Sequence, residues 1–206
     1  WNINSVSPST INNHLGNWLI REFGESAGKK LLPVMLEYYR LCGIRRPEHM
    51  GWTQVELDKA THVRGLSWIK DTEFSNEFGG EMDRYLEHYA YIKKAVEDIK
   101  QDISIEKRDA YFSHVEYQVC AAADMATKML EAQRARSYAN GQANSTLWSR
   151  DSLMTLASAK SIEAYYDIQN ITSYYNNKMA SGKWKYSMTY MPRDLFVYYP
   201  PMLPVL

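Results

Sequence analysis

The chain has 206 residues, of which 45% are apolar, and its 24 lysines and arginines equal its 24 aspartates and glutamates in number. This length suits one domain with a sizeable core, and a net charge of zero removes the general electrostatic attraction to nucleic acid or an anionic membrane. No stretch approaches the roughly 20 consecutive apolar residues of a spanning helix. We therefore expect neither nucleic acid nor membrane as a partner.

The first part of the chain predicts two helices. One runs over about residues 9–23 and ends at Gly24, because glycine commonly stops a helix. The second runs over about residues 27–42 and carries a leucine- and tyrosine-rich face. Proline is tolerated in the first turn of a helix, so Pro33 fits this helix if it begins near Lys30.

Helical periodicity weakens between residues 44 and 80. The run Arg45-Arg46-Pro47-Glu48 interrupts a helix, and residues 53–78 contain only short mixed patterns. We expect a long ordered connection with one or two short helices here.

A third helix is predicted over about residues 80–100, where apolar side chains recur in a seven-residue pattern. Its members are Met82, Tyr85, Tyr89, Ile92, Val96, Ile99 and Ile103. Ser104 then predicts the start of a fourth helix, and a fifth runs over about residues 145–180. Helices of roughly 35 residues are about 50 Å long at 1.5 Å per residue. We therefore expect the fourth and fifth helices to form an elongated antiparallel pair.

The last residues change character, because tyrosines and prolines alternate there. We expect an all-α fold: an elongated bundle of about five helices over residues 1–184, followed by an extended tail over residues 185–206 that leads to a further domain. Since Trp1 is not an initiator methionine, we also expect the chain to be a fragment of a longer protein.

Residue types that carry chemistry do not form a recognisable site. Two histidines, or a glutamate and a histidine, one helical turn apart would be typical of a metal site, and no such pair occurs; Asp58 and His62 have one-turn spacing but lack a second pair. There is no Gly-x-Ser-x-Gly elbow and no glycine-rich phosphate loop. We expect no catalytic, cofactor-binding or metal-binding residue in this chain.

The aromatic residues allow two interpretations. Sixteen tyrosines and six tryptophans can stack on the flat apolar faces of sugars, or can cover the edges of the bundle and contact other domains. Arg45 and Arg46 can each pair with a uronate carboxylate, or with Glu48 and carbonyl groups at a helix end. The candidates for carbohydrate or interdomain contact are Arg45, Arg46, Trp184 and Tyr190.

Several motifs of aromatic and charged residues occur in a collinear order. They are Trp1-Asn2, Trp18 with residues 21–24, Glu37-Tyr38-Tyr39, residues 45–48, residues 106–112, residues 115–121, Tyr174-Tyr175-Asn176 and Gly182-Lys183-Trp184. Taken together, these motifs resemble the helical domain of glycoside hydrolase family 115, the xylan α-glucuronidases. The resemblance covers about residues 1–184.

The resemblance implies a multidomain parent enzyme that removes glucuronic acid, or its 4-O-methyl form, from glucuronoxylan by inverting hydrolysis. It places the catalytic carboxyl groups in other domains, so none is transferred to this chain. It further implies a periplasmic or extracellular location, and as partners the other domains of the parent, a second copy of the chain or a xylan oligosaccharide. The leading hypothesis is a noncatalytic bracing domain, and the alternative is a carbohydrate-binding helical module.

Overall fold

The computed structural model describes residues 5–51, 55–57, 66–68, 74–75, 79–141 and 149–204. Its long helices confirm the predicted all-α bundle. They are α1 (Pro8–Phe23), α2 (Glu25–Ile44), α3 (Glu81–Ile99), the continuous helix formed by α4 (Arg108–Tyr111), a π-helical turn (Phe112–Glu116) and α5 (Tyr117–Ala139), and finally α6 (Arg150–Asn177). None of the described helices is both long enough and apolar enough to cross a membrane.

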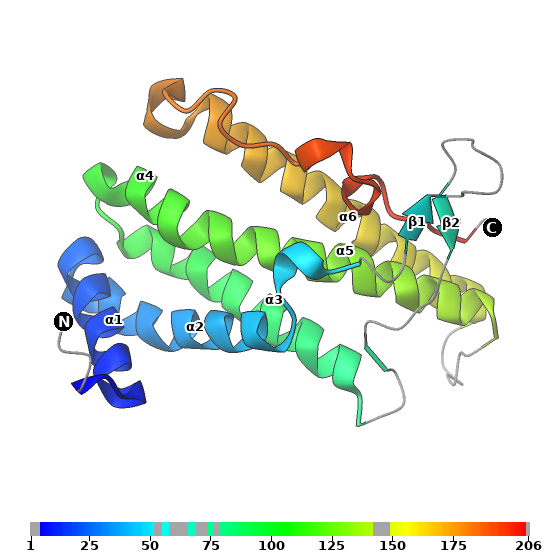
Figure 1. The fold of residues 1–206 in the computed structure, drawn as a ribbon, viewed down its shortest axis with the longest axis horizontal. Helices are drawn as coiled ribbons and strands as arrows, with labels where there is room; N and C mark the ends of the chain where they lie inside the picture. The colour runs from blue at the N-terminus through cyan, green and yellow to red at the C-terminus, as the bar shows by residue number, and fades with distance from the viewer. Residues whose placement is uncertain are drawn as a thin grey trace.

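Helix α5 lies in the middle of the bundle. Helices α1, α2 and α3 pack in succession on one side of it, and α6 lies antiparallel to it on the other side (Figure 1). The two long antiparallel helices are therefore confirmed. This arrangement explains why α5 is buried nearly all the way round, whereas the other helices each keep an exposed face.

The predicted seven-residue pattern of α3 is confirmed as a core stripe. All seven of its apolar residues are buried, and Ile92 and Val96 have no exposed surface. Tyr85 and Tyr89 meet edge to face with ring centroids 5.0 Å apart. A large apolar cluster joins α1, α2, α3 and α5, with Leu19, Leu31 and Val119 among its fully buried members.

Helix α2 begins at Glu25, directly after Gly24, whose φ of 88° suits glycine. The predicted start at about residue 27 is thus close to the observed one, and Pro33 lies inside the helix and not in its first turn. Pro33 and residue 29, whose carbonyl loses its helical donor, are both exposed. Water can replace the missing donor, which is why the helix continues through the proline.

The connection between α2 and α3 contains a short helix, as predicted, and also two strands that were not predicted. Its described part contains a short 3₁₀ turn (Pro47–His49) and two short antiparallel strands, β1 (Val55–Leu57) and β2 (Leu66–Trp68), with Val55 opposite Trp68. Valine and tryptophan favour strands, and three-residue strands are too short to show a clear period. The rest of residues 53–78, apart from 74–75, lies outside the described residues.

The C-terminal segment runs back over α6 and α5 after a 3₁₀ turn at Met179–Gly182 (Figure 1). Three residues of the long helices hold it. Asn176 exchanges two hydrogen bonds with the backbone of Met188, at 2.8 and 3.0 Å. Lys128 donates to the carbonyl of Val197 at 2.8 Å, and Arg136 donates to the carbonyl of Met202 at 2.6 Å.

Candidate functional site

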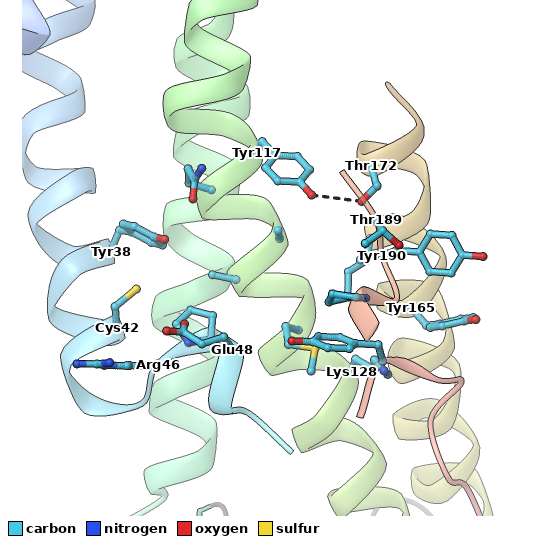
Figure 2. Close-up of a pocket in the computed structure, with 18 of the residues that line it drawn as sticks. Tyr38, Cys42, Arg46, Glu48, Tyr117, Lys128, Tyr165, Thr172, Thr189 and Tyr190 are labelled. Atoms are coloured by element: carbon cyan, nitrogen blue, oxygen red, sulfur yellow. Dashed lines mark hydrogen bonds between the residues drawn. The ribbon is translucent and has the colours of Figure 1, made fainter. Parts of the chain in front are cut away.

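A cavity of about 590 Å³ lies where the C-terminal end of α2, the middle of α5, α6 and the C-terminal segment meet (Figure 2). This volume is within the range of small-molecule sites, about 300–1,000 Å³. Each bordering element contributes tyrosine side chains to the lining. These are Tyr38, Tyr39, Tyr117, Tyr165, Tyr190 and Tyr198.

The tyrosines give the cavity apolar walls with polar tips. Tyr117 from α5 and Thr172 from α6 share a hydrogen bond of 3.4 Å across its upper edge (Figure 2). Burial raises the pKa of the Tyr38 hydroxyl and of the Cys42 thiol above their ordinary values. Neither group is therefore an activated nucleophile at neutral pH, and the walls suit a flat ring with hydroxyl groups at its rim.

Lys128 is the charged group at the base of the cavity. Its side chain is almost completely buried, with a relative exposure of 1%. Its ammonium group donates to the Val197 carbonyl and lies 5.5 Å from the centre of the Tyr165 ring. No carboxylate of the described residues forms an ion pair with it, and burial lowers its pKa to about 7.

A second charged cluster lies beside the cavity and ties three helices together. Lys93 on α3 donates to Asp124 on α5 at 2.6 Å and to Asp167 on α6 at 3.2 Å. Burial raises the pKa of Asp124 to about 6, although Lys93 opposes this shift. The lysine occupies both carboxylates, so this cluster is a structural ion pair and not a free acid–base pair.

The described residues hold no group of three or more histidine, cysteine, aspartate or glutamate side chains that could bind a metal ion. Glu131, the other buried carboxylate of α5, lies 3.6 Å from Arg134 and 3.7 Å from Lys160. The arrangement can bind a small molecule, and among the described residues it offers no pair of unpaired buried carboxylates for hydrolysis.

The structure brings together two of the four residues that the sequence singled out. Arg46 and Tyr190 both line the cavity, on opposite sides of it (Figure 2). Arg45 lies apart from the lining and donates to the carbonyl of His49 at 2.9 Å. Trp184 lies in the turn beyond α6 and is 43% exposed. The ammonium group of Lys183 lies 5.2 Å from the centre of its ring.

Sequence reasoning missed Lys128. It lies four residues after Asp124 and three before Glu131, which is the spacing of an ordinary solvated helix face. The signal that it is buried is the position of α5 between two layers, because a helix covered on both sides must bury its polar stripe as well. That position becomes visible only when the C-terminal segment is seen to cover α5.

Comparison with known proteins relates the chain to a solved structure. No family model and no curated protein matches the chain. Among solved structures, the chain is similar to one described as a novel family GH115 4-O-methyl-α-glucuronidase, BtGH115A, with specificity for decorated arabinogalactans. The identity is 34%, the TM-score is 0.73, and the match covers 98% of this chain and 24% of that structure. The chain thus spans about a quarter of the length of its relative.

Proposed function

The chain is a helical domain related to glycoside hydrolase family 115, and we propose that it is a noncatalytic part of a larger secreted enzyme that removes (4-O-methyl)glucuronic acid from a plant polysaccharide. In this proposal the domain braces the catalytic domain of the parent enzyme, which the family resemblance implies to be a barrel, or a neighbouring subunit. Support comes from the relative, which contains a region of this fold within a chain about four times as long.

The observation that carries the bracing role is the outward face of α6. Leu156, Ile162 and Tyr166 are 51%, 40% and 58% exposed, while Met154, Ala157 and Ala164 on the inward face are buried. Exposed polar residues such as Lys160 and Glu163 lie among these three apolar side chains, so the outward surface of α6 is of mixed character. Large apolar side chains that gather on an exposed surface can mark a site of contact with another protein or domain.

The test is made in the full-length protein that contains this chain. Replacing Leu156→Glu together with Tyr166→Glu places two charges in the proposed interface. We expect lower thermal stability of the whole enzyme, loss of the second copy if it is a dimer, and at least a tenfold lower rate of uronic acid release. Asn170→Glu, on an exposed polar site of the same helix, is the matched control. Unchanged rate, mass and melting temperature in the double variant would contradict the bracing role.

The noncatalytic assignment has its own test. The isolated chain is incubated with glucuronoxylan and with a glucuronidated arabinogalactan, and the released uronic acid is measured. We expect none from either, because the catalytic carboxyl groups are proposed to lie in other domains. Release from either substrate would show that the chain is itself a hydrolase. In the full-length enzyme, the same two substrates decide which backbone is preferred; glucuronoxylan is our expectation.

A second candidate function is carbohydrate binding by the domain itself. The placement of Arg46 and Tyr190 in one cavity favours it, because a guanidinium group and a ring together suit an acidic sugar. Affinity electrophoresis of the isolated chain in gels containing glucuronoxylan is the measurement. Retardation that disappears in the Arg46→Met variant would support this function, and migration equal to that in a gel without polysaccharide would exclude it.

A further inference from the structure

The buried charges on α5 are not all compensated in the same way. Asp124 is bonded to Lys93, and Glu131 lies near Arg134 and Lys160. Lys128 is more deeply buried than either, yet its one hydrogen-bond acceptor in the described structure is the neutral carbonyl of Val197. An ammonium group has three donors, and burying a cation without an anion is costly. The unmatched charge therefore points to a partner of opposite sign.

The position of Lys128 shows where that partner would lie. The residue lines the cavity, with Tyr165 and Tyr190 on one side of it and Arg46 and Glu48 on the other (Figure 2). The tyrosine rings supply flat apolar surface on which a ring can pack. A ligand that carries a ring and an anionic group would satisfy both the walls and the lysine.

The charge of the lining selects the kind of anion. Arg46 and Glu48 carry opposite charges, and the tyrosine and cysteine groups are neutral, so a protonated Lys128 leaves the lining with one net positive charge. A monoanion balances this charge. A phosphate, which carries closer to two negative charges, would be left partly uncompensated near Glu48. A planar carboxylate also accepts hydrogen bonds from an ammonium group directly.

We propose that this cavity binds a small ring-bearing carboxylate, whose carboxylate group accepts a hydrogen bond from Lys128 and whose ring packs against the tyrosines. Two sources share this chemistry: a hydroxylated sugar acid and an aromatic acid. The proposal rests on the environment of Lys128 and does not depend on the hydrolase assignment.

Binding should be linked to protonation of the lysine. Because burial lowers the pKa of Lys128 to about 7, much of the free protein at pH 8 holds a neutral amine. A bound carboxylate favours the charged form and raises this pKa, so binding at pH 8 takes up a proton. Affinity should accordingly fall about tenfold for each pH unit above 7.

The experiment is isothermal titration of the 206-residue chain with glucuronate and with 4-hydroxybenzoate, alongside glucose and phenol as neutral counterparts. We expect one of the two carboxylates to bind at least tenfold more tightly than its neutral counterpart, and the stronger of the two identifies the source. The Lys128→Met variant should lose at least tenfold in affinity. The Lys94→Met variant is the control, since Lys94 is exposed and bonded to Asp98 on its own helix.

A second measurement keeps the proposal testable if the Lys128→Met variant unfolds. The wild-type titration is repeated at pH 8 in two buffers that differ in ionisation enthalpy, and the proton uptake is calculated from the difference. Uptake close to one proton per ligand supports the proposal. Equal binding of carboxylates and neutral counterparts, no binding of either carboxylate at 10 mM, or binding at pH 8 without proton uptake would each overturn it.

Discussion

The two sides of helix α5 differ in the kinds of side chain that they bury. Toward α2 and α3 the contacts are apolar and dense, with residues such as Leu31, Ile92 and Val119 fully buried. Toward α6 and the C-terminal segment, α5 buries the charged side chains of Lys128 and Arg136, whereas the buried Asp124 is bonded to Lys93 of α3. Apolar burial supplies most folding free energy, whereas buried charges cost desolvation and are retained for specific contacts. We therefore expect the first side to supply most of the stability, and we propose that the second side binds a ligand.

The largest expected effect tests the apolar side. Ile92→Ala removes buried methyl groups and leaves a cavity, so we expect a loss of about 3–4 kcal/mol in the free energy of unfolding. Urea unfolding followed by circular dichroism measures it. Tyr91→Ala, on the exposed face of the same helix, is the control and should change stability by less than about 0.5 kcal/mol. Similar losses in the two variants would show that α3 does not pack as described.

The next largest effect is expected from breaking the ion pair between Lys93 on α3 and Asp124 on α5. Lys93→Met leaves the buried Asp124 without its cation, and we expect a loss of about 3 kcal/mol at pH 7. The double variant Lys93→Met with Asp124→Leu should recover most of this loss, because it removes the unpaired charge. A double variant no more stable than the single one would contradict the assignment of Asp124 as a buried anion.

The pH dependence of the same variant follows from the pKa of Asp124. In the folded chain this pKa is about 6, above the ordinary value of 3.8, so the folded state holds the proton more tightly than the unfolded state. The favourable contribution of protonation is present below about pH 4 and is lost as the pH rises to about 6. The Lys93→Met loss should therefore be smaller at pH 5 than at pH 7, as the same urea unfolding will show.

Lys128 should have the opposite effect at higher pH, where it makes the free energy of unfolding rise with pH. Its folded pKa of about 7 lies below the ordinary value of 10.5, so between these values the unfolded state binds the extra proton. The stability of the wild-type chain should rise between pH 7 and pH 9, by about 1 kcal/mol per unit from this group. The Lys128→Met variant should lack this rise, whereas Lys94→Met should keep it. An equal rise in all three proteins would mean that another group titrates.

The smallest effect concerns the C-terminal segment. Asn176→Ala removes both hydrogen bonds to the backbone of Met188, and we expect about 1 kcal/mol of local destabilisation. Hydrogen exchange should become faster in the segment after α6 and not in α3. Asn177→Ala is the matched control, because in the described part of the chain the Asn177 side chain donates to Ser173 on its own helix. Equal exchange in the two variants would show that Asn176 does not hold the segment.

The same contrast explains what the sequence could predict. The α3 pattern from Met82 to Ile103 could be predicted from the sequence, because one helix face meets a continuous apolar core and this imposes a helical period. The approximate ends of α1 and α2 were also readable, since Gly24 and Gly43 lie at or near them. The place of Pro33 inside α2 was not predicted, because the cost of a proline depends on whether its face of the helix is exposed, which is a tertiary property.

The candidate site was only partly predictable. Arg46 and Tyr190 were singled out as residue types that suit an acidic sugar, and the fold places both in the cavity. Lys128 was not, because a lysine between Asp124 and Glu131 has the spacing of a solvated face. The cavity itself is formed by segments far apart in the chain, and local periodicity does not encode how the C-terminal segment covers α5.

Lys128 is a buried lysine without an anionic partner among the described residues, and the titration of its ammonium group can be measured. The chain is labelled with ¹³C at lysine, the Cε signal of Lys128 is assigned by its absence in Lys128→Met, and its shift is followed from pH 5 to pH 11. We expect a midpoint near pH 7 that moves upward when a ring-bearing carboxylate is added. A midpoint near 10.5, unaffected by either carboxylate, would contradict it.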